Sequence, residues 1–191
     1  MMDRRELLHR AAYLLGGAIS ASAASGILAG CVAGPETSSA APDFLTEEEK
    51  RTVAAMVEQI IPRTNTPGAT DAGVPAFVEK MMAGYYQEKE RTLFHAGMRQ
   101  VATDAAELRG KSFAELASED QIALMKEYDR EAYAPRPTGS DPHFFRMMKE
   151  LTVLGYCTSK AGATKLLKYA PVPGPYQGDV PYSQVGKAWA L

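Results

Sequence analysis

The sequence of 191 residues contains little cysteine, little histidine and no recognisable cofactor-binding motif. Its two cysteines and three histidines lie far apart, and none has the spacing of a metal site or a haem attachment. Glycine-rich nucleotide-binding loops and the G-x-S-x-G turn of serine hydrolases are also missing. We therefore predict no catalytic, cofactor-binding or metal-binding residue in this chain.

Single residues that would suit such chemistry have simpler explanations. His143 stands at a predicted helix start, where a solvated or capping histidine is a better interpretation than a general base. His95 has no evident base or nucleophile to act with. Two methionine pairs would suit copper, but without a nearby cysteine or histidine they are better explained as core residues. Turn formation accounts for Asn65 and Asp71.

The chain also lacks a strong excess of either charge. It has 21 basic and 23 acidic residues, a net charge of −2, and no run of lysine or arginine. This balance gives no electrostatic case for nucleic-acid binding, so we predict no nucleic-acid partner. The hydrophobic share of 46% and the length suit one globular domain with some chain left over.

The first 30 residues resemble a twin-arginine export signal. Arg4 and Arg5 precede an apolar run that glycine and serine make only weakly hydrophobic. The sequence LAGC that ends at Cys31 resembles a lipobox, in which the cysteine is acylated and becomes the new N-terminus. An uncleaved anchor helix and ordinary signal cleavage nearby are the alternatives. We expect an exported, periplasmic lipoprotein anchored in the membrane, with residues 31–43 as a flexible tether.

Residues 44–170 show the hydrophobic periodicity of helices and almost no strand alternation. We therefore predict an all-α fold, a single domain of about five helices. Helices are expected to begin near Thr46, Pro75, Glu88, Ser118 and Pro142. Capping boxes are predicted at Thr46–Glu49 and Ser118–Gln121, and Asp141 is predicted to cap the last helix. Gly110 is expected to end a helix, Gly155 to end one or to allow a close contact, and residues 163–168 to form a short helical piece.

The C-terminal residues 171–191 are predicted to form an extended tail without helix, because they are rich in proline and glycine. From Tyr169 onward the chain carries more aromatic residues than a disordered tail usually has. The tail is expected either to bind a partner or to pack on its own helical core. The residues predicted to contact a partner are Tyr169, Pro171, Pro173, Tyr176, Tyr182 and Trp189.

Cys157 is the second cysteine of the chain expected after signal cleavage, besides Cys31. An odd thiol in an exported protein indicates either an inter-subunit disulfide or a buried free cysteine. Both interpretations stay open.

Three parts of the chain resemble gluconate 2-dehydrogenase subunit 3, the small subunit of membrane-associated flavin dehydrogenases. One is IIPRTNTPGATDAGVPAFVEKMM, residues 60–82, in which Asn65 stands where the family usually has aspartate. Another, residues 144–182, is similar to the family patterns GY-x-T-S and PVPG-x-Y. The third is the twin-arginine leader, so the resemblance covers nearly the whole chain.

The resemblance implies a non-catalytic subunit without a cofactor of its own. In such complexes a large subunit of the glucose-methanol-choline oxidoreductase type holds FAD and oxidises a sugar or sugar acid, and a cytochrome c subunit often accepts the electrons. The small subunit is implied to bind the large one and escort it through twin-arginine export. A stand-alone envelope lipoprotein that binds a ligand without a flavin partner is the main alternative. An independent lipoprotein enzyme is a weaker one.

Overall fold

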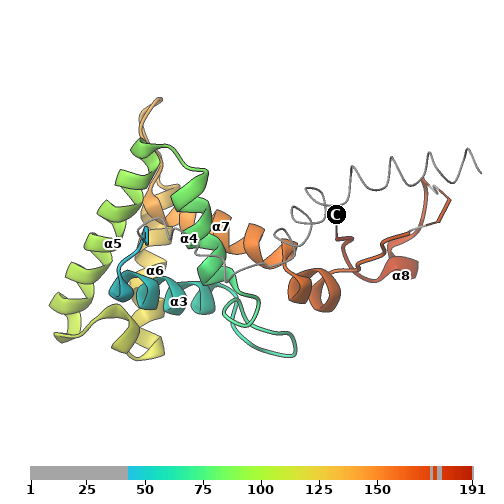
Figure 1. The fold of residues 1–191 in the computed structure, drawn as a ribbon, viewed down its shortest axis with the longest axis horizontal. Coiled ribbons are helices and arrows are strands. Elements are labelled where there is room, and N and C mark those ends of the chain that lie inside the picture. The colour runs from blue at the N-terminus through green and yellow to red at the C-terminus, as the bar shows by residue number, and fades with distance from the viewer. Residues whose placement is uncertain (1–42, 173, 176–177, 191) are drawn as a thin grey trace, which may run out of the picture. The chain divides into compact units, whose positions relative to one another are not determined.

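The structure is a computed structural model that describes residues 43–172, 174–175 and 178–190 (Figure 1). Within these residues it is helical, without a β-strand, which confirms the all-α class. The helices are α3 (Glu47–Ile60), α4 (Val74–Gly84), α5 (Glu88–Arg109), the 3-10 helix η1 (Phe113–Glu115), α6 (Ser118–Tyr133), α7 (Phe144–Thr158), the π-helix η2 (Gly162–Leu166) and α8 (Tyr182–Val185).

Several predictions fall outside these residues. They concern the signal peptide with Arg4 and Arg5, the lipidation site Cys31, almost all of the tether, and the tail residues Pro173 and Tyr176. In the described part of the chain, no helix has the length and apolar character needed to cross a membrane.

Helix α7 is the central element of the helical domain, because it packs against α3, α4, α5 and α6 (Figure 1). Eight of its 15 residues are buried, which is more than one amphipathic stripe requires. The surrounding helices each bury a narrower face; in α3 this face contains Val53, Met56 and Val57, as the periodicity predicts.

Local signals predicted several helix ends correctly. The Thr46 hydroxyl accepts a hydrogen bond from the Glu49 amide (3.2 Å), and the Glu49 carboxylate accepts one from the Thr46 amide (2.9 Å). Pro75 lies in the first turn of α4. Gly110 ends α5 in the left-handed conformation with φ 66°, which favours glycine. The short helical piece predicted at 163–168 is the π-helix η2.

The predicted capping box at Ser118 is wrong. Ala117 occupies the N-cap position of α6, and Ser118 is the first residue of the helix. The Ser118 hydroxyl instead accepts a hydrogen bond from the Gln59 side chain (3.1 Å), a partner 59 positions away. A capping box forms a few residues earlier, between Ser112 and Glu115 at the start of η1.

The predicted start of the last long helix at Asp141 and Pro142 is also wrong. Helix α7 begins at Phe144, and the His143 ring nitrogen Nδ1 accepts a hydrogen bond from the Phe145 amide (3.3 Å). The Asp141 carboxylate does not cap this helix because it pairs with the Lys89 ammonium (2.5 Å).

The prediction of a C-terminal tail without helix is wrong, because the tail contains one helical turn. Helix α8 follows Pro181, and Gly186 ends it with φ 73°. The Tyr182 hydroxyl donates to the Gly186 carbonyl (3.2 Å) across this turn. A proline just before the first turn is compatible with a helix, since the amides there need no helical partner.

Two glycines allow helices to approach closely around α7. A Cβ atom at Gly97 would lie 2.0 Å from Cγ of Phe144, and one at Gly155 would lie 2.6 Å from Cδ1 of Phe77. Gly155 therefore does not end α7 but gives room to the Phe77 side chain from α4.

Gly97→Ala is expected to lower the free energy of unfolding by about 1–3 kcal/mol, because the new methyl group has to displace the buried Phe144 ring. Denaturant unfolding followed by circular dichroism measures this change. Gly84→Ala is the matched control, since a Cβ there meets no atom within 4 Å and alanine favours the helix. Equal loss of stability in both variants would contradict the packing argument.

Candidate functional site

The two segments that carry the family resemblance meet at the end of α7. The fully buried Tyr156 of α7 donates its hydroxyl hydrogen bond to the carbonyl of Pro67 in the loop between α3 and α4 (2.6 Å). Beside this contact lies a hollow of about 340 Å³. It is lined by Pro67, Asp71 and Ala72 of the loop and by Lys160, Ala161, Thr164 and Lys165 after α7.

The Glu58 carboxylate organises the loop. It accepts hydrogen bonds from the Arg63 amide (3.0 Å) and from both the amide (3.0 Å) and the hydroxyl of Thr70. Partial burial alone would raise the pKa of Glu58, but these hydrogen bonds outweigh it and hold the pKa below its ordinary value. A Cβ at Gly68 would lie 2.2 Å from Oε1 of Glu58, so a larger residue there would have to displace the Glu58 carboxylate from these hydrogen bonds.

Asp71 also serves the loop. Its carboxylate accepts a hydrogen bond from the Gly68 amide (3.1 Å) and pairs with the Arg63 guanidinium. The predicted turn role of Asp71 is therefore confirmed, while Asn65 is exposed on the same loop. In the part of the chain that the structure describes, no three potential metal ligands come together.

The chain makes a hydrogen-bonded corner directly after α7. Ser159 leaves the helix with extended backbone, its hydroxyl donates to the Tyr156 carbonyl (2.7 Å), and it accepts from the Gly162 amide (2.9 Å). A Cβ at Gly162 would lie 1.9 Å from the Tyr156 carbonyl oxygen, so the corner requires glycine. This corner sets the direction in which η2 continues.

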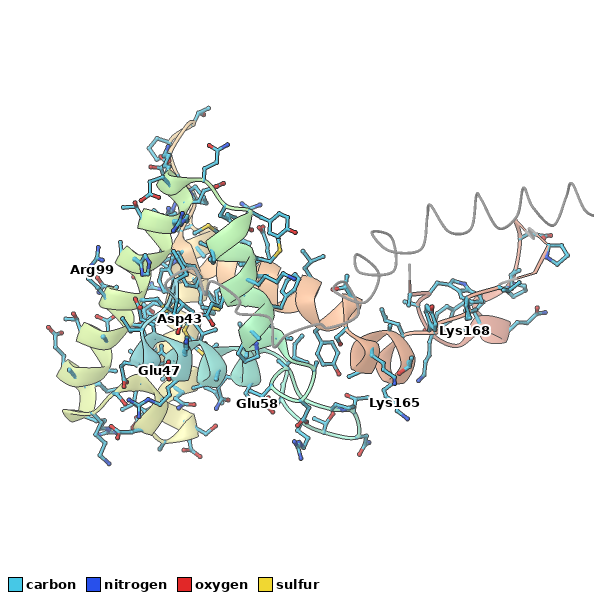
Figure 2. All side chains as sticks on the ribbon, in the orientation of Figure 1. Asp43, Glu47, Glu58, Arg99, Lys165 and Lys168 are labelled. Carbon is cyan, nitrogen blue, oxygen red and sulfur yellow. The ribbon has the colours of Figure 1, made fainter. Side chains whose placement is uncertain are left out.

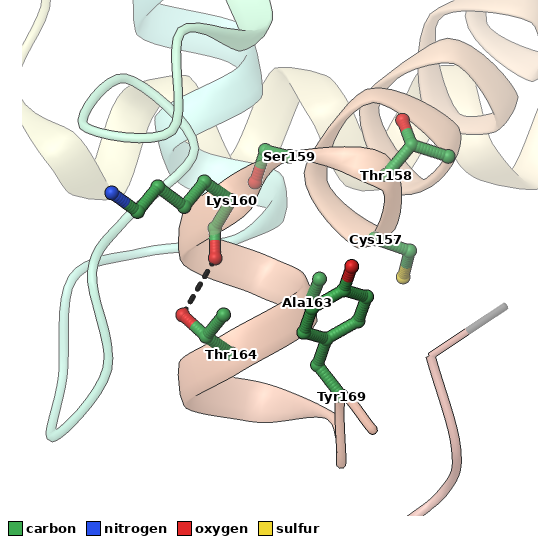
Figure 3. Close-up of a pocket in the computed structure, with 7 residues that line it drawn as sticks. All are labelled: Cys157, Thr158, Ser159, Lys160, Ala163, Thr164 and Tyr169. Carbon is green, nitrogen blue, oxygen red and sulfur yellow. Dashed lines mark hydrogen bonds between the residues drawn. The ribbon is translucent and has the colours of Figure 1, made fainter. Parts of the chain in front are cut away.

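A second hollow, of about 300 Å³, lies at this corner (Figure 3). Its lining includes Cys157, Thr158, Ser159, Lys160, Ala163, Thr164 and Tyr169. Cys157 is half-buried and forms no disulfide within the described residues. Figure 3 shows the Cys157 sulfur on the same side of the hollow as the Tyr169 ring. The inter-subunit disulfide stays a prediction.

The C-terminal segment closes into a loop by returning to its own start. The Lys168 amide donates to the Ala188 carbonyl (2.8 Å), and the Ala190 amide donates to the Lys168 carbonyl (3.0 Å). The Lys168 ammonium lies 4.6 Å from the centre of the Trp189 ring, a cation–π contact. These contacts hold the two ends of the tail together.

Four of the tail side chains predicted to contact a partner lie in the described residues, and all four are exposed. The exposed fraction is 55% for Tyr169, 72% for Tyr182 and 45% for Trp189, and Pro171 is also exposed. The structure brings Tyr169 to the second hollow and Trp189 to Lys168. Whether these side chains bind another protein stays a prediction.

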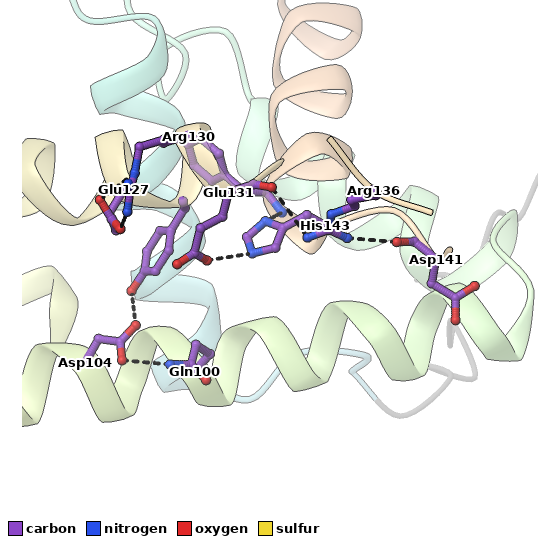
Figure 4. A network of polar contacts seen from close by, with 10 residues as sticks. Gln100, Asp104, Glu127, Arg130, Glu131, Arg136, Asp141 and His143 are labelled. Carbon is purple, nitrogen blue, oxygen red and sulfur yellow. Dashed lines mark hydrogen bonds and ion pairs between the residues drawn. The ribbon is translucent and has the colours of Figure 1, made fainter. Parts of the chain in front are cut away.

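Polar groups elsewhere in the domain connect helices (Figure 4). The Tyr128 hydroxyl of α6 donates to the Asp104 carboxylate of α5 (2.7 Å), which also accepts from Gln100 (2.8 Å). Burial and this bond to Asp104 raise the pKa of Tyr128, so its hydroxyl remains a donor. His95 lies 3.0 Å from the Glu49 carboxylate and therefore joins the network of the first helix cap.

His143 fulfils the capping role that the sequence favoured over a catalytic one. Its Nδ1 accepts from the Phe145 amide, and its Nε2 lies 3.4 Å from a Glu131 oxygen (Figure 4). Burial lowers the pKa of His143 below its ordinary value, with the nearby Arg136 acting in the same direction and Glu131 opposing it. The folded protein thus favours the neutral imidazole, the form that can accept the amide.

The sequence model of the family described as gluconate 2-dehydrogenase subunit 3 matches residues 47–174. Because this match covers well over half of the chain, the protein belongs to that family. The resemblance predicted from residues 60–82 and 144–182 is therefore confirmed. Comparison with curated proteins and with solved structures finds no match.

Tyr156→Phe is expected to loosen the loop of residues 62–73, because it removes the hydrogen bond to Pro67 while keeping the ring in the core. The loop should lose about 0.5–1.5 kcal/mol of local stability. This loss should appear as faster hydrogen exchange of the loop amides, measured by mass spectrometry. Tyr133→Phe is the control, since that ring is 57% exposed. Unchanged exchange in Tyr156→Phe would contradict the role of this bond.

His143→Asn is expected to flatten the loss of stability in acid, because asparagine can cap a helix but does not titrate. With a lowered folded pKa, the stabilising contribution of neutral His143 is complete above its unfolded pKa of about 6.5. It is lost as the pH falls from there through the folded pKa. Denaturant midpoints at several pH values below and above this point measure the effect. If the denaturant midpoints of wild type and variant changed with pH in parallel, the role of His143 titration would be contradicted.

Proposed function

We propose that this protein is the non-catalytic small subunit of a periplasmic FAD-dependent dehydrogenase complex acting on a sugar or sugar acid. It binds the large flavoprotein subunit, which carries the FAD, and escorts it through twin-arginine export. Membership of the family over residues 47–174 carries the proposal, since the family name describes a dehydrogenase subunit. A cytochrome c subunit that accepts the electrons is a further partner in such a complex.

Two features of the C-terminal region support a binding role. Exposed tyrosine and tryptophan side chains are the residue types most enriched at the energetic centres of protein interfaces. The loop that presents them is already closed by backbone hydrogen bonds at Lys168, so less conformational entropy is lost on binding. We assign partner contact to Tyr169, Pro171, Tyr182 and Trp189, together with Pro173 and Tyr176, which lie outside the described residues.

Export and anchoring are proposed from the sequence pattern. Arg4 and Arg5 supply the twin-arginine signal, and acylation of Cys31 attaches the mature protein to the membrane. A large subunit without a signal of its own would then cross the membrane in the folded complex.

Affinity purification of the full-length chain from its native envelope fraction tests the proposal. A partner that shows flavin absorption, identified by mass spectrometry near a one-to-one ratio, is the expected result.

Tyr169→Ala combined with Tyr182→Ala should weaken the complex by roughly tenfold or more. Tyr85→Ala combined with Tyr133→Ala is the matched control, because these rings are also exposed but lie on the helical domain.

Each outcome separates the parts of the proposal. A flavoprotein that is retained equally by both double variants would preserve the subunit role and contradict the tail as its contact. A well-folded chain that purifies without any flavoprotein would contradict the subunit role. That result would favour the stand-alone lipoprotein that binds another envelope ligand.

A further inference from the structure

The charges of the described chain are divided unevenly between the helical domain and the C-terminal segment. Residues 43–158 contain 14 basic and 19 acidic side chains, a net charge of −5. Residues 159–190 contain four lysines and one aspartate, a net charge of +3. Figure 2 shows Asp43, Glu47 and Glu58 on the helical domain, and Lys165 and Lys168 on the C-terminal segment.

The two groups of basic residues also differ in their partners. Nine of the 14 basic side chains in the helical domain lie within 4.0 Å of a carboxylate. None of the four C-terminal lysines has such a partner among the described residues. Lys187 donates to the Lys165 carbonyl (2.9 Å), and Lys168 lies over the Trp189 ring. Within the described part of the chain, no carboxylate therefore compensates their positive charges.

These lysines and the exposed rings form one continuous surface. Lys160 and Tyr169 line the hollow of about 300 Å³, Lys160 and Lys165 line the neighbouring hollow, and Lys187 contacts the backbone of Lys165. We call this the basic–aromatic surface. It consists of Lys160, Lys165, Lys168, Tyr169, Lys187 and Trp189.

We infer that the basic–aromatic surface docks on an acidic patch of the flavoprotein subunit that also places a side chain in the hollow beside Tyr169. This inference rests on the proposed function and adds the chemistry of the partner surface. The uncompensated lysines attract carboxylates and repel basic surfaces, whereas burial of the rings contributes most of the binding energy.

A lipid surface with anionic headgroups would attract the same residue types. The geometry favours a protein, because the tail is closed by specific backbone hydrogen bonds and stands next to a hollow large enough for a side chain. Lipid headgroups are fluid and adapt to a protein surface, so binding them does not require a tail with a preformed shape. The acidic helical domain of a second copy is another protein surface of suitable charge, and the experiment below distinguishes it.

The test compares two triple variants that change the net charge equally. One combines Lys160→Gln, Lys165→Gln and Lys187→Gln on the basic–aromatic surface. The control combines Lys80→Gln, Lys111→Gln and Lys126→Gln, which are exposed lysines of the helical domain without an ion pair among the described residues. Association with the flavoprotein that co-purifies with the full-length chain is followed by biolayer interferometry at low and high salt. Circular dichroism melting verifies that both variants fold.

Wild type and control should associate faster at an ionic strength of about 0.05 M than at about 0.5 M, because salt screens the attraction. The basic–aromatic variant should associate roughly tenfold more slowly at low salt and show a weaker salt dependence. Dissociation should change less than association.

Equal rates for both triple variants would overturn the inference while leaving the subunit role intact. Failure of the wild-type chain to bind any flavoprotein would overturn both.

Vesicles of phosphatidylglycerol and phosphatidylcholine test the lipid alternative. If only vesicle binding depends on the three lysines, the surface serves the membrane and the inference is wrong. If light scattering shows a dimer that only the basic–aromatic variant loses, the partner surface belongs to a second copy, and the inference is wrong as well.

Discussion

The burial of α7 among four other helices is the constraint on which the rest of the structure depends. Because this helix contacts neighbours on several sides, its partners must approach closely, and Gly97 and Gly155 provide the space. The same burial fixes Tyr156, whose hydroxyl then reaches the Pro67 carbonyl and holds the loop between α3 and α4. The corner at Ser159 begins from this fixed point, so the position of the C-terminal segment follows from the packing of the core.

Sequence reasoning succeeded where the deciding interaction is local. The capping box at Thr46 and the left-handed glycine at Gly110 depend on residues within one helical turn, and both were predicted. It failed where a distant group competes for the same side chain. Ser118 binds Gln59 and Asp141 binds Lys89, and neither partner can be identified from the neighbouring residues.

In the candidate site, too, local features were predictable from the sequence and distant contacts were not. Composition alone predicted an aromatic tail, and the family patterns marked both segments that form the site. Their contact was not predictable, because Tyr156 and Pro67 are 89 positions apart in the sequence. The charge difference between the domain and the tail could have been counted from the sequence. Its significance depends on which basic groups have carboxylate partners, and only the structure shows that.

The residues of the family patterns and the residues of the basic–aromatic surface have different physical tasks. Gly68, Gly162 and Tyr156 shape the backbone, since a larger side chain or a lost hydroxyl would disturb the loop or the corner. Lys168, Lys187 and Trp189 help to close the tail, but their charged groups and rings stay accessible for further contacts. In the proposed complex, the lysines and rings contact the partner, while the pattern residues keep them in place. This division explains why the family patterns identify a dehydrogenase subunit without indicating the substrate of its complex.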